Sequence, residues 1–233
     1  YAITGTKIFI SAGEHDLTQN IVHLVLARLP DAPAGTRGIS LFVVPKFRPD
    51  ANGDAGERNG VVCGSIEHKM GIHASPTCVM HFNGSIGWLL GKPNEGLACM
   101  FTMMNQARLG VGLQGHGLSE LAWQASIAYA NDRLQGRAMS GVKEPGKAAD
   151  PIIVHPDVRR MLLTQKAFVE GGRVLCFLTG REIDSAHLNP DPQARQASND
   201  LIAFLTPIVK GFLTEAAMEV TSLAVQIHGG HGF

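Results

Sequence analysis

The sequence lacks an excess of either charge, any pair of closely spaced cysteines and any long uninterrupted apolar run. Basic and acidic residues number 20 each, which argues against a nucleic acid or an anionic membrane as the main partner, because such partners select a clustered basic face. No apolar run reaches about 18–20 residues, so we expect no membrane span. The cysteines are scattered without a CxxC motif, and we expect reduced, buried thiols at Cys63, Cys78, Cys99 and Cys176.

Several catalytic and nucleotide-binding motifs are missing as well. The chain has no GxSxG, no P-loop and no GxGxxG after a strand, so the direct sequence signals for a serine hydrolase, a phosphate loop or a dinucleotide turn are absent. The chain starts within a strand pattern, without Met, and stops in a Gly/His stretch. We therefore expect its 233 residues, 45% of them apolar, to be a piece of a longer protein.

Residues 1–92 have the pattern of a β domain. Short runs rich in β-branched and aromatic residues are separated by Gly, Pro and Asn, without helical segments between them. This pattern predicts a β-sandwich or an open barrel. The predicted strands are residues 21–29, 38–46, 61–68 and 77–84, and the predicted loops are residues 30–35 and 48–60.

Residues 93–233 have the pattern of long helices. Apolar residues recur near the helical period, and the predicted helices cover residues 94–134, 155–184 and 195–228. A Gly- and Pro-containing linker over residues 136–151 and a break at "HLNPDP" separate them. The chain is therefore predicted to be of the α+β class, with a β domain followed by part of an antiparallel helical bundle.

The opening stretch "YAITGTKIFIS" reads as a tight hairpin. Gly5 and Thr6 would form a two-residue turn between residues 1–4 and 7–11. Strand alternation would then place Phe9 and Ser11 on one face. A large ring beside a hydroxyl is an unusual pair for a strand surface, and it marks this end of the strand for attention.

The middle of the first predicted helix carries polar residues among methionines and leucines. Asn105 and Arg108 are three residues apart and share a face. Four glycines follow, each costing about 1 kcal/mol relative to Ala in a helix interior. Two interpretations stay open: a closely packed helix pair with a structural arginine, or the close approach of a flat ligand. The glycines are at positions 110, 112, 115 and 117.

Two further stretches could bind an anion. Arg133 and Arg137 are four residues apart near a helix C-terminus, where they could grip phosphate or simply be solvated. Gly229 and Gly230 could form an anion-binding nest or a plain helix C-cap. The spacing His228-x-x-His231 also invites a metal interpretation, which we disfavour because no Asp, Glu or Cys stands nearby.

Six stretches, taken in order, resemble the acyl-CoA dehydrogenase family. They are "GTKIFIS", "GISLFVVPK", "HKMGIHASPT", "LLGKPNEGLACMFTMMNQARLGVG", "YANDRLQGR" and "QIHGGHGF". The resemblance covers essentially the whole chain, and its wording is most similar to the branch that contains 3-methylmercaptopropionyl-CoA dehydrogenase. It implies the middle β domain and the C-terminal helical domain of that fold, with the N-terminal helical domain absent.

The resemblance implies FAD as the cofactor and assigns residues to it. Phe9, Ile10 and Ser11 match the strand that lies against the flavin, so we expect a ring system to cover them; Phe stands where the family has Trp. Two further groups would hold the nucleotide end, typically in a neighbouring subunit, and His155 falls near another such position. Their residues are Arg133 with Gln135, and Gln226 with Gly229 and Gly230. Gly136-Arg137 replaces the family's usual Phe-Gly.

The resemblance also implies a reaction and its substrate contacts. An acyl-CoA thioester would lose its α-proton to a Glu and its β-hydrogen as hydride to flavin N5. Asn105 and Arg108 align with a substrate-contacting pair. Neither family position for the base is filled here: one would lie beyond Phe233, and the other is Ala107. We therefore expect the base to lie outside this segment, and the segment alone to be inactive.

The expected partners follow from the same resemblance. They are an acyl-CoA, an electron-transfer flavoprotein as acceptor and a second copy of the chain in a homodimer or homotetramer. The compartment would be the bacterial cytoplasm, or the mitochondrial matrix for a eukaryotic protein. Two alternatives share the fold: an acyl-CoA oxidase that reduces oxygen, and a non-catalytic flavin- or DNA-binding relative, against which the balanced charge argues.

Overall fold

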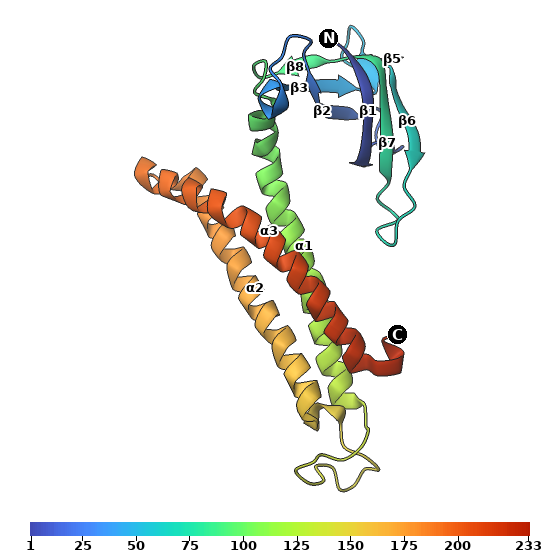
Figure 1. The fold of residues 1–233 in the computed structure, drawn as a ribbon, viewed down its shortest axis with the longest axis vertical. Helices are drawn as coiled ribbons and strands as arrows, with labels where there is room; N and C mark the ends of the chain where they lie inside the picture. Colours follow the sequence, from blue (N-terminus) through green and yellow to red (C-terminus); the bar gives the residue numbers. More distant parts are fainter. The chain divides into compact units, whose positions relative to one another are not determined.

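The computed structural model describes residues 1–233 and divides into two compact units, residues 1–103 and 104–233 (Figure 1). The first unit holds all the strands, and the second holds most of the helical residues. Helix α1 (Gly96–Asp132) runs through the boundary without a break. This α+β arrangement, sheets followed by three long helices, is the predicted one.

Antiparallel sheets build the first unit. One sheet has the order β1-β7-β6, a second has the order β2-β3-β8, and β4 pairs with β5. The bounds are β1 Ala2–Ser11, β2 Val22–Arg28, β3 Ile39–Pro45, β4 Phe47–Pro49, β5 Ala55–Arg58, β6 Val61–Ile66, β7 Thr77–Ile86 and β8 Trp88–Leu90.

The core of the first unit lies between its two larger sheets. On β7, every second residue points inward, so that Cys78, Met80 and Phe82 are all buried. They pack with Phe42 and Val44 of β3, which belong to the facing sheet. Two sheets that share one apolar layer form a sandwich, as the alternation of the sequence predicts.

The predicted hairpin at the start of the chain is wrong. Residues 2–11 form one continuous strand whose partner is β7, where Gly5 lies opposite Phe82 and Ser11 opposite Thr77. The register shifts between Lys7 and Ile10, and Phe9 has a positive φ of 57°. This bulge interrupts the alternation from which we placed Phe9 and Ser11 on one face.

Two short features of the β unit were also missed. The predicted loop at residues 48–60 contains β5 and part of β4, and β8 was not predicted. These strands have only three or four residues each. Such short strands leave too little alternation to separate them from the Gly-, Pro- and Asp-rich turns around them.

Three helices form the second unit. Helix α2 spans Pro156–Leu188 and α3 spans Pro192–His228, each with Pro in its first turn, and short 3₁₀ turns occupy Gly35–Gly38, Ile152–Val154 and Gly229–His231 elsewhere in the chain. The Asp191 carboxylate caps α3 by accepting a hydrogen bond from the Gln193 amide at 2.9 Å. The predicted helices are present, with α2 extending four residues beyond its expected end.

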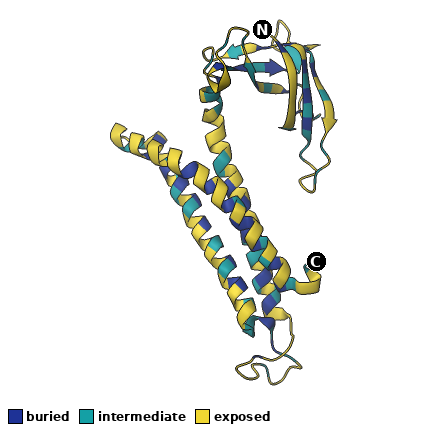
Figure 2. Cartoon of the chain, viewed as in Figure 1, coloured by how far each residue is buried: buried dark blue, intermediate teal, exposed yellow.

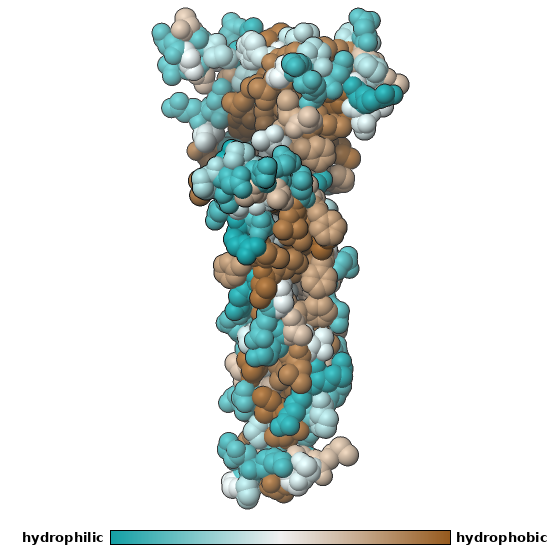
Figure 3. All heavy atoms as spheres, turned by 90° about the vertical axis from the view of Figure 1, so that its left-hand side faces the viewer, coloured by the Kyte–Doolittle hydropathy of each residue, from teal (hydrophilic) through white to brown (hydrophobic).

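The facing sides of the helices carry the buried residues, as the dark blue segments of Figure 2 show. Cys176 of α2 packs with Val209 and Leu213 of α3. A second cluster joins the ends of the three helices through Ala130, Ile152, Met161, Leu162 and Ile227. Other apolar side chains stay on the surface of the unit (Figure 3), among them Phe177, Phe204 and Phe212.

Two expectations from the sequence, that the thiols are buried and that no segment is apolar enough to span a membrane, are met only in part. All four cysteines are free, but only Cys78 and Cys176 are buried. The segment Pro192–His231 is long and apolar enough to cross a membrane by length and composition alone. This is weak evidence for a span, since helices that pack in the core of a soluble protein meet the same criterion.

Two of the helix glycines make room for a neighbouring helix. A Cβ added to Gly115 would lie 2.8 Å from the backbone oxygen of Leu213, and one added to Gly112 would lie 2.8 Å from the Val209 side chain. Gly110 and Gly117 have open space at that position. The packed-helix interpretation is therefore confirmed for Gly112 and Gly115.

We expect Gly115→Ala to destabilise the protein by about 1–3 kcal/mol, because the new methyl group meets the backbone of α3. The matched control, Gly117→Ala, should instead stabilise it by about 0.5–1 kcal/mol, since the helix gains a better helix former without a clash. Urea unfolding followed by far-UV circular dichroism measures both. Equal effects of the two substitutions would contradict the close contact between α1 and α3.

Candidate functional site

A pocket of about 540 Å³ lies in the second unit where the ends of helices α1 and α3 meet the start of α2. We refer to it as the helix-end pocket. It brings together five of the predicted cofactor residues and His155. Its lining residues are Tyr129, Arg133, Gln135, Ile152, His155, Val158, Gln226, Ile227, His228, Gly229, Gly230 and His231.

The segment that follows α1 forms one wall of the helix-end pocket. Gln135 is held on both sides of its backbone: its amide donates to the Asp150 carbonyl at 2.9 Å, and its carbonyl lies 2.7 Å from His155 Nε2. The Arg133 carbonyl accepts from the Ile152 amide at 2.8 Å. These bonds fix the backbone that carries the Arg133 and Gln135 side chains.

Arg133 and Arg137 lie near the C-terminus of α1, as predicted, but they do not act as a pair. Helix α1 ends at Asp132, so neither arginine lies within it. The Arg137 guanidinium turns away to the buried Asp150 carboxylate, with Nη1 at 3.2 Å from Oδ1. Arg133 lines the pocket and forms no salt bridge.

The end of α3 forms the opposite wall. Gly229 is the C-cap, with φ 57° and ψ −130°, and its amide donates back to the carbonyls of Val225 and Gln226. This geometry confirms the plain C-cap interpretation. Gly230 follows in the 3₁₀ turn Gly229–His231, where both glycines are exposed to the pocket. Whether they also form an anion-binding nest stays a prediction.

Tyr129 connects the two walls. Its ring stacks on His228, with centroids 4.5 Å apart, and its hydroxyl lies 3.1 Å from His231 Nδ1. His228 Nδ1 also lies 2.8 Å from the Ala224 carbonyl. Both histidines therefore have partners within the protein, and no group of three or more metal-ligating side chains occurs in the chain. Tyr129 begins the motif "YANDRLQGR", and no spacing in the sequence marks it as a site residue.

The composition of the helix-end pocket suits an anion. Arginine, histidine and glutamine side chains line it, and no carboxylate does. An arginine fork that no acidic residue neutralises attracts phosphate oxygens and can bind them in a bidentate way. Exposed glycine backbone at a helix end adds N–H donors with little steric hindrance. The residues present thus fit the pyrophosphate of a dinucleotide such as FAD.

The residues predicted to meet the flavin ring lie in the first unit. Phe9 is 67% exposed and Ser11 is exposed, whereas Ile10 packs partly against the β core. No part of the chain itself covers Phe9 and Ser11, and the expectation that a ring system lies against them stays a prediction. The bulge at Phe9 explains the exposure, because it turns the aromatic ring off the alternating inner face.

Ile10 lines a smaller cavity of about 230 Å³ within the β unit. Met80, Phe82 and His23 contribute to the same cavity. Burial lowers the pKa of His23 below its ordinary value, and the imidazole packs edge-on against Phe82 at 6.0 Å. The cavity is apolar and lacks a charged lining besides Lys7.

The predicted substrate pair lies in the first half of α1. Asn105 is exposed and Arg108 is half-buried. Along the helix axis, Arg108 is roughly 36 Å from the C-terminal end of α1 at Asp132. The structure therefore does not bring this pair together with the helix-end pocket within one chain. Ala107, at one family position of the base, offers no proton acceptor.

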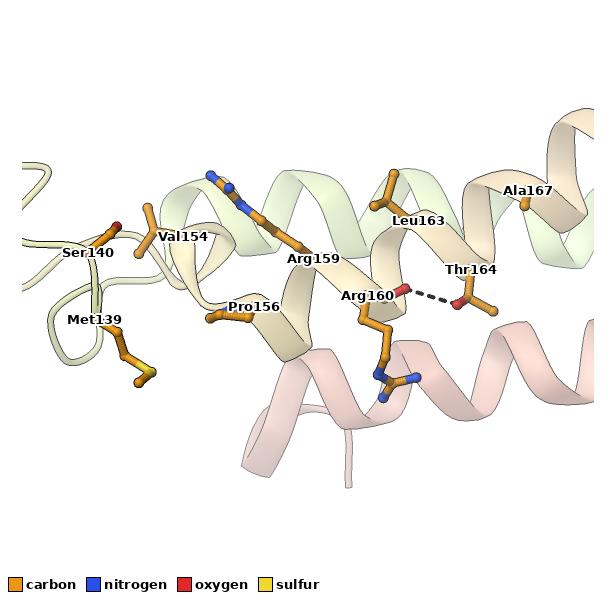
Figure 4. A pocket seen from close by; sticks show the side chains of 9 residues that line it. All are labelled: Met139, Ser140, Val154, Pro156, Arg159, Arg160, Leu163, Thr164 and Ala167. Atoms are coloured by element: carbon orange, nitrogen blue, oxygen red, sulfur yellow. Dashed lines mark hydrogen bonds between the residues drawn. The ribbon is translucent and has the colours of Figure 1, made fainter.

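Another cavity, of about 730 Å³, lies beside the start of α2 (Figure 4). Its two arginines point to opposite sides. Both already have hydrogen-bond acceptors within the protein: Arg159 Nε donates to the Ile153 carbonyl at 2.9 Å, and Arg160 Nε donates to Asp157 at 2.8 Å. None of the predicted site residues lines it. The lining residues are Met139, Ser140, Val154, Pro156, Arg159, Arg160, Leu163, Thr164 and Ala167.

The chain is similar to known proteins over its whole length. A family model described as "Acyl-CoA dehydrogenase, C-terminal domain" matches residues 94–233. The chain is 54% identical to 3-methylmercaptopropionyl-CoA dehydrogenase of Ruegeria pomeroyi over 233 residues and 40% identical to a butyryl-CoA dehydrogenase of Syntrophomonas wolfei over 241 residues. All of the chain is aligned in both cases, and it spans 39% of the length of each relative.

Solved structures show the same likeness. The butyryl-CoA dehydrogenase of Megasphaera elsdenii superimposes with a TM-score of 0.75 and 26% identity. That match covers 100% of this chain and 51% of the other. The paired sheets and the three long helices are therefore a part of that fold, with both units represented.

We expect Gly229→Ala to destabilise the end of α3 by about 1–3 kcal/mol, because φ 57° with ψ −130° is a conformation that only glycine adopts readily. Gly230→Ala is the control, since a Cβ there has open space and the residue has no positive φ. Urea unfolding and hydrogen exchange at Val225 to His231 measure the difference. A Gly229→Ala protein as stable as the control would contradict the C-cap geometry.

Proposed function

We propose a function that proceeds from the chain's family: it belongs to the acyl-CoA dehydrogenases. The protein that contains it would use FAD to oxidise an acyl-CoA thioester between its α and β carbons. The observation that carries this proposal is the helix-end pocket, where an unneutralised arginine, two glutamines and two glycines meet without any carboxylate. Bound FAD would supply the acceptor for the hydrogen that leaves the β-carbon.

The helix-end pocket would hold the nucleotide end of FAD. Arg133 would bind pyrophosphate oxygens, and the Gln135 and Gln226 side chains would donate to nearby polar atoms. Gly229 and Gly230 would let the dinucleotide approach the backbone at the end of α3. His155, which already fixes the Gln135 carbonyl, would keep this wall in place.

The β unit would meet the other end of the cofactor. Ser11 would offer a hydroxyl near flavin N5, Ile10 would support the strand from the core, and Phe9 would lie on the ring face. The exposure of Phe9 and Ser11 in this chain means that their cover would come from a ligand or from other protein surface. An aromatic face with its apolar area available supports such a contact.

The substrate would contact Asn105 and Arg108. The substrate pair and Arg133 are held apart along one rigid helix. Within one chain they would therefore contact different ligands, unless a second copy of the chain brings its Arg133 close to the substrate pair of the first. This separation supports a homo-oligomer in which one copy's helix-end pocket completes the site of another. The proton acceptor would be a carboxylate from outside residues 1–233, so this segment alone would be inactive.

The redox partner and compartment complete the proposal. An electron-transfer flavoprotein would take the electrons, in the bacterial cytoplasm or, for a eukaryotic protein, the mitochondrial matrix. Acyl-chain identity would depend on residues outside this segment, and the resemblance to 3-methylmercaptopropionyl-CoA dehydrogenase makes a short thioether acyl chain the first substrate to assay.

The test uses the protein expressed at its natural full length. We expect it to be yellow, with the visible absorption bands of bound flavin, and to reduce an artificial electron acceptor when an acyl-CoA is added. Oxygen consumption without that acceptor would identify an oxidase instead. A colourless, flavin-free protein that leaves acyl-CoA unchanged would overturn the proposal in favour of a non-catalytic relative.

We further expect Arg133→Met to raise the dissociation constant for FAD by about tenfold to a hundredfold, because the pyrophosphate would lose a charge-assisted bidentate partner. The control is Arg160→Met, which removes an exposed arginine of the same unit whose partner is Asp157. Flavin fluorescence titration of the apoprotein gives both values. Matching affinities in the two variants would remove Arg133 from the proposed site.

A further inference from the structure

The loop of residues 136–151 folds around one buried carboxylate. Asp150 is completely buried, and its two carboxylate oxygens accept four hydrogen bonds. The amide of Ala138 donates to Oδ2 at 2.9 Å, and three donors reach Oδ1. Those three are the amide of Glu144 at 2.7 Å, the amide of Lys143 at 3.0 Å and Arg137 Nη1 at 3.2 Å.

The backbone of Asp150 extends the same connection to the helix-end pocket. Its amide donates to the Gly136 carbonyl at 2.9 Å, and its carbonyl accepts from the Gln135 amide at 2.9 Å. The bridge between Leu134 and Pro151 continues this pairing. One residue therefore holds the loop by its side chain and the pocket wall by its backbone.

We propose, resting on the function proposed above, that Asp150 is a positioning residue that sets the backbone of Arg133 and Gln135 for the dinucleotide. Asp150 does not line the helix-end pocket and would not touch the ligand. It acts through the segment between Arg133 and Ala138, which joins the end of α1 to the loop. Without the carboxylate, three backbone amides and a guanidinium would be left without their shared acceptor, and the segment would lose its fixed path.

The ionisation of the carboxylate agrees with this role. The hydrogen bond from the Ala138 amide, followed by those from Glu144, Lys143 and Arg137, lowers the pKa of Asp150 to about 2, although burial acts in the opposite direction. The folded-state pKa is thus below the ordinary value, so the stabilisation is present at neutral pH and is lost as the pH falls toward 2. The carboxylate is charged under any condition used to assay a flavoprotein.

The experiment compares three variants of the full-length protein with the wild type. Asp150→Asn keeps the shape but turns one acceptor oxygen into a donor that faces other donors. We expect it to raise the dissociation constant for FAD about tenfold or more. Arg137→Met removes only one of the four donors and should raise it a few-fold. Asp157→Asn, which removes an exposed carboxylate from the start of α2, should leave it unchanged.

A second measurement separates positioning from general stability. With FAD in saturating excess, kcat of Asp150→Asn should return to within about twofold of the wild-type value, because the reacting end of the site is untouched. Hydrogen exchange should accelerate at the amides of Gln135, Ala138, Lys143 and Glu144 and stay unchanged in the first half of α2. If Asp150→Asn does not fold, the FAD dissociation constant of Arg137→Met tests the positioning role by itself.

The outcomes are distinct. Unchanged FAD affinity in Asp150→Asn and Arg137→Met, with a wild type that binds FAD, overturns the positioning role and leaves the proposed function intact. A lowered melting temperature with unchanged affinity likewise overturns it, since the carboxylate would then be purely structural. A wild-type protein that binds no FAD overturns the proposed function and, with it, the role of Asp150 toward this ligand.

Discussion

The close contact between helices α1 and α3 decides where the helix-end pocket forms. Gly112 faces Val209 and Gly115 faces Leu213, so the two backbones approach without a side chain between them on α1. Further along, Tyr129 of α1 stacks on His228 of α3 with almost the same offset in sequence. Two parallel helices that keep one offset over several turns must end side by side. The pocket is the space between those ends, and its position is thus fixed by residues far from it.

The chemistry of that pocket depends on where the neighbouring carboxylate goes. Asp150 is close in sequence to the pocket wall, yet its side chain is buried in the 136–151 loop and its charge is satisfied by Arg137 and three backbone amides. Arg137 is used in the same contact, which leaves Arg133 as the arginine at the pocket. One internal ion pair therefore removes both a competing anion and a second cation, and leaves the Arg133 guanidinium as the positive charge at the pocket.

The long elements were predictable from the sequence, and the local exceptions to alternation were not. Helical periodicity and prolines at Pro156 and Pro192 mark α2 and α3 within a few residues. Gly5 was assigned to a hairpin turn because a Gly-Thr pair between two apolar runs has the composition of one; its real partner, Phe82, lies too far along the chain for any local pattern to indicate. The composition of residues 136–151 likewise predicts only a linker. Its order comes from Asp150, and one buried carboxylate in a Gly- and Pro-containing segment gives no periodic signal.

Of the candidate site, the sequence predicted the residues that belong to recognisable motifs. Arg133, Gln135, Gln226, Gly229 and Gly230 were named from sequence, and the structure brings them to one pocket, although their ligand remains a proposal. The predicted helix over residues 94–134 already implies that Asn105 and Arg108 lie far from its C-terminal end, and α1 agrees with this. A straight helix cannot fold back on itself, so the roughly 36 Å between Arg108 and the end of α1 is a fixed property of the chain. A ligand that contacts both groups within one chain must therefore extend over that distance.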